Sequence, residues 1–106
     1  MPVLRRGRFD ELVRRQLDLF EQDNEVLLDE AEAADAAWTN ASRDETEELY
    51  GDYQLVVDQI AEQLLDVRET YAASLDEDTA ETYRRAFNRV AVIRFRPYSA
   101  LLLDGE

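Results

Sequence analysis

The residues of this chain whose types and spacing could do chemistry are acidic side chains in two separate stretches. Glu45, Glu48 and Asp52 follow one another at intervals of three and four, which would place their carboxylates on one face of a helix. Asp29 and Glu32, three residues apart, are predicted to lie on a neighbouring helix near the same end. Carboxylate oxygens are the ligands that Mg²⁺ takes in proteins. The spacing alone leaves two interpretations open, a metal site or a solvated helix face.

The residue types that are missing exclude much other chemistry. There is no cysteine, so neither a disulfide nor a zinc–thiolate site can form. There is no histidine, which removes the usual general base and the usual transition-metal ligand. The sequence also has no lysine, which excludes Schiff-base chemistry and the lysine of a P-loop. We therefore predict no catalytic residue and no cofactor, with Mg²⁺ and an enzyme as the alternative.

Two stretches, 27-LLDEAEAADAA-37 and 47-EELYGDYQLVV-57, together resemble the MazG-type all-α nucleotide pyrophosphohydrolases. That family carries acidic motifs on two antiparallel helices, with a Glu-Glu-Leu-Gly-Asp run on the second. The resemblance implies a Mg²⁺-dependent nucleoside triphosphate pyrophosphohydrolase whose metal ligands would be Asp29, Glu32, Glu48 and Asp52. Tyr50 is an extra residue within the run, and it turns the aspartate by about 100° about the helix axis relative to the family pattern.

Charge is unevenly distributed along the chain, whose net charge is −13. Residues 84–96 contain no acidic residue and five arginines, namely Arg84, Arg85, Arg89, Arg94 and Arg96. An arginine-rich helix can follow phosphates, so a nucleic-acid-associated regulator is a second alternative. A strongly negative protein repels a polyanion, however, which makes a nucleic-acid partner the weaker prediction. We expect the basic segments to pack against the acidic middle of the chain and neutralise it.

Apolar residues at steps of three and four predict an all-α fold in one domain, residues 1–106. The stripes indicate helices over 9–38, 43–74 and 79–95, followed by an apolar tail over 97–106 that folds back. The expected architecture is a long antiparallel hairpin plus a shorter third helix, a three-helix bundle. In the first helix Leu12, Leu19 and Val26 widen the stripe, as a bundle requires. Asn24 stands at an interior position, which we interpret as fixing register or partner choice.

The expected helix boundaries have local signals. Ser42 and Glu45 have the spacing of a capping box at the start of the second helix. The acidic run that begins at Asp76 suits the positive N-terminal end of the third helix. Pro97 disfavours helix in the residue before it, so the third helix must end near Arg96.

The third helix is too short to cover both long helices, so one end of the hairpin is expected to stay open. The apolar residues predicted to be exposed there are Ala31, Ala34, Trp38, Leu49 and Tyr53. Leaving such a surface in water is unfavourable by about 25 cal/mol per Å². Either the C-terminal tail or a second chain must cover it, and we predict a homodimer that forms through this end.

No run of about 18 apolar residues is present, so no membrane association is expected. The basic start is not followed by the apolar stretch of a signal peptide, so the default prediction is a cytoplasmic protein. The favoured function is a small acidic helical module that acts through protein–protein interaction or as an accessory subunit.

Overall fold

The structure, a computed structural model, describes residues 7–103, and within them the chain is all-helical with no β-strand. The elements in chain order are α1 (Asp10–Asp23), α2 (Glu25–Thr39), α3 (Thr46–Ala72), α4 (Glu77–Arg94) and the 3₁₀ helices η1 (Arg96–Tyr98) and η2 (Ala100–Leu102). The all-α prediction is therefore confirmed, with four α-helices in place of the three expected. Residues 104–106 of the predicted tail lie outside the described residues.

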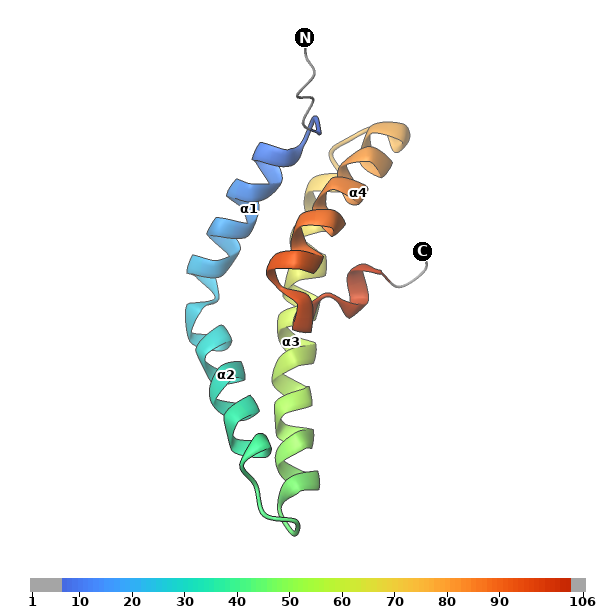
Figure 1. The fold of residues 1–106 in the computed structure, drawn as a ribbon. Coiled ribbons are helices and arrows are strands. Elements are labelled where there is room, and N and C mark those ends of the chain that lie inside the picture. The colour runs from blue at the N-terminus through green and yellow to red at the C-terminus, as the bar shows by residue number, and fades with distance from the viewer. Residues whose placement is uncertain (1–6, 104–106) are drawn as a thin grey trace.

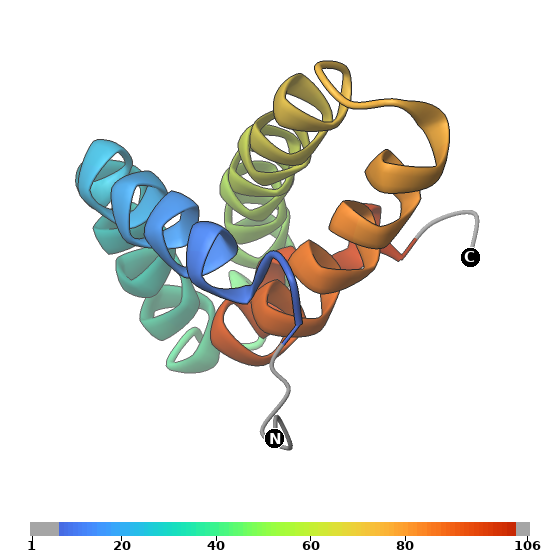
Figure 2. The same ribbon diagram turned by 90° about the horizontal axis from the view of Figure 1, so that it is seen from above.

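The helices form a molecule with one wide end and one narrow end. α2 runs antiparallel to α3 along the lower half of the molecule, whereas α4 and α1 flank the upper half of α3 (Figure 1). Seen from above, α1, α3 and α4 stand around a common centre (Figure 2). The radius of gyration is 16.3 Å, against about 13 Å for a compact domain of this length. The narrow end, built from α2 and α3 alone, accounts for this elongation.

Asn24 divides the predicted helix 9–38, so the expectation of one continuous first helix was wrong. The side-chain amide of Asn24 donates to the carbonyl oxygen of Phe20 at 2.9 Å, and its backbone N–H donates to the same oxygen at 3.0 Å. An asparagine amide competes in this way with the regular helix ladder. Asn40 makes the same pair of bonds to Ala36 and ends α2. At Asn24 the helix resumes, because the N–H of Leu28 still donates to the Asn24 carbonyl.

The two predicted helix caps differ in outcome. α3 begins at Thr46, and the Ser42 hydroxyl donates to the carboxylate of Glu45 at 3.2 Å instead of accepting from the backbone. The capping box predicted there was wrong. At α4 the Asp76 carboxylate accepts from the Thr79 backbone N–H at 2.9 Å and from the Thr79 hydroxyl at 2.8 Å. The acidic cap at α4 is confirmed, with the helix starting two residues earlier than predicted.

The core lies mainly in the wide end, where α1, α3, α4 and the tail meet. Its largest fully buried side chains are Val13, Leu17, Ile60, Leu64, Tyr83, Phe87 and Leu102. Tyr83 packs edge-on against Phe9, with ring centroids 5.5 Å apart, and its hydroxyl donates to Gln16 at 2.8 Å. Most of these side chains recur at helical steps of four within one helix, as the predicted apolar stripes require.

The C-terminal tail folds back onto the bundle, as predicted. It lies on α3, and Arg68 holds it there. η1 and η2 both pack against α3. Arg68 donates to the Asn88 side-chain oxygen at 2.8 Å and to the Leu102 carbonyl at 3.0 Å. Asn88 in turn donates to the same Leu102 carbonyl at 3.1 Å. One arginine therefore ties α3, α4 and the tail together.

Candidate functional site

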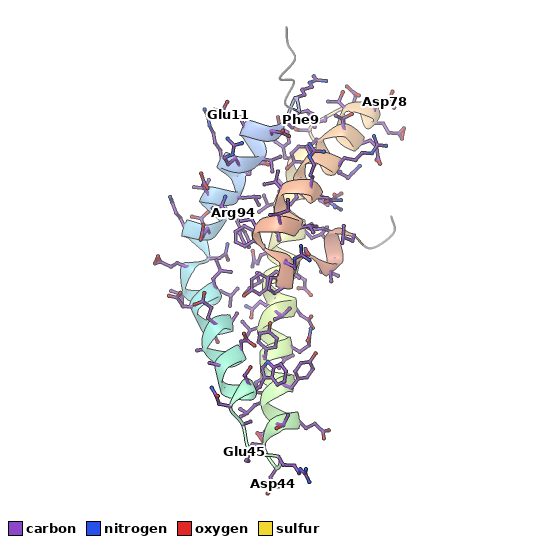
Figure 3. All side chains as sticks on the ribbon, viewed as in Figure 1. Phe9, Glu11, Asp44, Glu45, Asp78 and Arg94 are labelled. Atoms are coloured by element: carbon purple, nitrogen blue, oxygen red, sulfur yellow. The ribbon has the colours of Figure 1, made fainter. Side chains whose placement is uncertain are left out.

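The structure does not bring the four predicted metal ligands together. Asp29, Glu32, Glu48 and Asp52 are all exposed, and among residues 7–103 no group of three or more carboxylates is arranged to hold a metal ion. Asp29 and Glu32 instead line a groove together with residues of α1 and η1, and neither Glu48 nor Asp52 lines it. A Cβ placed on Gly51 would meet no atom within 4 Å, so the glycine in the acidic run makes no room for a neighbour. Glu45, which completes the acidic face, lies at the tip of the hairpin (Figure 3).

Three of the five clustered arginines pair with acidic side chains of other helices. Arg84 binds both carboxylate oxygens of Glu69 at 2.9 and 3.0 Å. Arg89 lies 3.0 Å from Asp10, while Arg94 lies 2.8 Å from Asp18 and 2.6 Å from Glu21. The hydrogen bonds from Arg84 and then Arg68 lower the pKa of Glu69. The expected neutralisation of the basic segment by the acidic helices is confirmed for these three arginines.

The predicted open end is partly closed by the chain itself. Ala31 is fully buried, so the expectation that it is exposed at this end was wrong. Ala34, Trp38, Leu49 and Tyr53 are half-buried. Tyr98 of η1 lies close enough to Tyr53 and Glu32 for their charges to raise its pKa, after the larger effect of its own burial. The tail therefore covers the middle of the hairpin and leaves the narrow end two helices thick.

An aromatic cluster of Trp38, Tyr50 and Tyr53 fills the narrow end between α2 and α3. The Trp38 ring lies edge-on to Tyr50 at 5.0 Å and 6.3 Å from Tyr53, measured between centroids. The indole N–H of Trp38 is buried and has no hydrogen-bond partner among residues 7–103, which is unfavourable for a polar group. Burial, followed by the charges of Asp35 and Tyr50, raises the pKa of Tyr53. Tyr50 is 45% exposed, so the cluster has a surface open to solvent.

A groove of about 600 Å³ lies at the bend between α1 and α2. It is lined by Asp18, Glu21, Gln22, Glu25, Leu28, Asp29, Glu32, Arg94, Phe95 and Tyr98. Sequence reasoning missed it, because the groove exists only where α1 and α2 bend and η1 turns in beside them. The exposed acidic spacing from Glu25 to Glu32 was the available signal.

A second, smaller groove of about 380 Å³ separates α1 from α3 on the side away from α4. Gln16, Phe20, Gln63 and Val67 are among the residues that line it. Leu19 at its edge is 57% exposed, and Val26, seven residues further along the chain, is 80% exposed. The expectation that these two residues widen a buried stripe was wrong, because no helix of this chain packs on that side in the part that is described.

No helix in the described part of the chain combines the length and the apolar composition needed to cross a membrane. Comparisons with protein-family models, with curated proteins and with solved structures found no match to this chain.

Proposed function

We propose that this protein is a small interaction module that pairs with a second copy through its narrow end. The observation that supports the proposal is the aromatic cluster of Trp38, Tyr50 and Tyr53, which sits where the fold is only two helices thick. Its half-buried rings gain free energy if a further layer excludes water from them, by about 25 cal/mol per Å² of apolar surface. Two hairpin ends laid together make a four-helix layer, the arrangement by which helical hairpins complete a core.

Electrostatic repulsion opposes this pairing, because each copy has a net charge of −13. Repulsion between two such copies is long-ranged at low ionic strength and is screened within about 10 Å at 0.1 M salt. Pairing is therefore expected to strengthen as salt is added. This dependence is opposite to that of a complex held by ion pairs.

Sedimentation equilibrium at micromolar concentration tests the pairing. The wild type should sediment as a dimer, and Tyr50→Glu should sediment as a monomer, because the variant buries a charge among the rings. Leu55→Glu is the matched control: Leu55 lies on the same helix, is 69% exposed and stands five residues after Tyr50, about 140° further around the helix. A wild-type monomer across the micromolar range, or equal loss in both variants, would overturn the proposal.

The fluorescence of Trp38 gives an independent measurement of the pairing, because Trp38 is the single tryptophan of the chain. On dilution through the dissociation range its emission should move to longer wavelength as water reaches the ring. Neither the Mg²⁺-dependent hydrolase nor the nucleic-acid reading gains a supporting contact among residues 7–103, so neither is proposed.

A further inference from the structure

The groove at the bend between α1 and α2 combines an apolar floor with acidic walls. Leu28, Phe95 and Tyr98 are its apolar lining residues, contributed by α2, the end of α4 and η1. Asp18, Glu21, Glu25, Asp29 and Glu32 are the acidic ones. Arg94 reaches from α4 toward α1 at this level (Figure 3) and is the one cation among the lining residues.

Arg94 pairs with acidic side chains in only the upper part of the groove. It binds Asp18 and Glu21, and its guanidinium group lies 5.3 Å from the centroid of the Phe95 ring. Among residues 7–103, the three carboxylates of α2 in this groove have no cationic partner. These are Glu25, Asp29 and Glu32. The first two are four residues apart on one helix, where like charges destabilise the helix.

The contacts of Arg94 show what the groove accommodates. A guanidinium group is held between two carboxylates and over an aromatic ring, which combines charge-assisted hydrogen bonds with a cation–π contact. The lower half of the groove repeats these components without the cation, because Glu32 and the half-buried Tyr98 both line it. Burial raises the pKa of Tyr98, and nearby charges that include Glu32 raise it further. The fold thus fills one of two similar positions with its own arginine.

We propose that this groove docks a basic amphipathic segment of a partner protein. Arginines of the segment would pair with the carboxylates of α2, and an aliphatic side chain would lie on Leu28 and Tyr98. Charge complementarity selects this occupant, because a polyanion would be repelled and the acidic middle of a second copy would be repelled as well. Three carboxylates at intervals of four and three match cations at the same intervals on a helix. The docking site is distinct from the narrow end and does not require the pairing proposed above.

A fluorescein-labelled synthetic helical peptide serves as the probe, with arginines at intervals of four and three and leucines on the same face. Binding is followed by fluorescence anisotropy with the full chain. The groove variant Asp29→Asn with Glu32→Gln should bind at least about tenfold more weakly than the wild type. The matched control is Glu62→Gln with Asp66→Asn, which removes the same charge from exposed positions on α3 outside the groove. The control should change the affinity by less than about twofold.

Equal weakening in the groove and control variants would overturn the proposal, since it would show only attraction to a negative protein. A second peptide, with serine in place of leucine, tests the apolar floor and should bind more weakly than the first. Equal binding of the two peptides would also overturn the docking site. Circular dichroism of both variants confirms that folding is unchanged. Sedimentation of the same samples measures the oligomeric state independently of peptide binding. A monomer that binds the peptide would contradict the proposed dimer and leave the proposed docking site standing.

Discussion

At the scale of single residues, Arg68 is the side chain on which the packing of the tail depends most. Its side chain is only 11% exposed, and it donates to Asn88 and to the Leu102 carbonyl. Arg68→Leu leaves these acceptors without this donor in a buried setting, which should lower the free energy of unfolding by about 2–3 kcal/mol. Arg84→Leu removes a partly exposed pair with Glu69 and should cost less than about 1 kcal/mol. Urea unfolding of the two variants compares these losses, and similar values would contradict the role of Arg68.

Ionisation of the Tyr83 hydroxyl makes the stability of the protein depend on pH in the alkaline range. Burial raises the pKa of this hydroxyl to about 12 from the ordinary 10.0. A raised pKa means that the folded state resists losing the proton, so this contribution to stability is complete below pH 10 and is lost as the pH rises toward 12. Tyr83→Phe should reduce the fall in melting temperature across this pH interval, as measured by thermal unfolding at a series of pH values. An unaltered slope in Tyr83→Phe would show that other groups dominate.

At the scale of elements, the helix ends differ in how much their first residues stabilise them. Asp76 accepts two hydrogen bonds from Thr79 at the start of α4, and these bonds also lower the pKa of the Asp76 carboxyl. Asp76→Ala should therefore lower the denaturant midpoint, because the Thr79 backbone N–H loses its cap. Ser42→Ala should have a much smaller effect, because the Ser42 hydroxyl contacts only the exposed Glu45 carboxylate. Denaturant midpoints measure both, and a larger loss at Ser42 would contradict the observed cap geometry.

At the scale of the whole molecule, unbalanced negative charge opposes the folded state. The net charge is −13, and the groove at the bend gathers five carboxylates around one arginine. Raising the salt concentration from about 0.01 to about 1 M shortens the screening length from about 30 to about 3 Å, so the melting temperature should rise by several degrees. Asp29→Asn with Glu32→Gln should melt higher than the wild type at low salt and equally at high salt. A melting temperature that falls on adding salt would show that ion pairs outweigh the repulsion.

Local periodicity predicted much of the fold, and the exceptions depend on how the helices pack against one another. The apolar stripes predicted α3 and α4 to within a few residues, because burial of one helix face imposes a repeat of 3.6. The break at Asn24 was not predicted, since an interior asparagine can either stay within a helix or divert the carbonyl four residues before it. Which of these occurs depends on the free energy of packing, that is, on whether α1 is stabilised more by packing against α4 than by continuing along α3.

The candidate sites divide in the same way. Carboxylates at intervals of three and four on Asp29, Glu32, Glu48 and Asp52 could be read directly, but their convergence could not. Convergence requires the rotation of each helix about its own axis, and the packing of α2 on α3 turns these side chains into solvent.

The sequence by itself determined the all-α class, the helical stripes, the absence of cysteine, histidine and lysine chemistry, and the excess of acidic residues. Only the tertiary structure decided that Arg94 meets Asp18 and Glu21, that the tail reaches α3, and that a groove opens at the bend. The physical reason is the distance along the chain over which each kind of interaction acts. Periodicity and composition act between residues a few positions apart, whereas a groove or an ion pair between helices depends on how those helices are placed against one another.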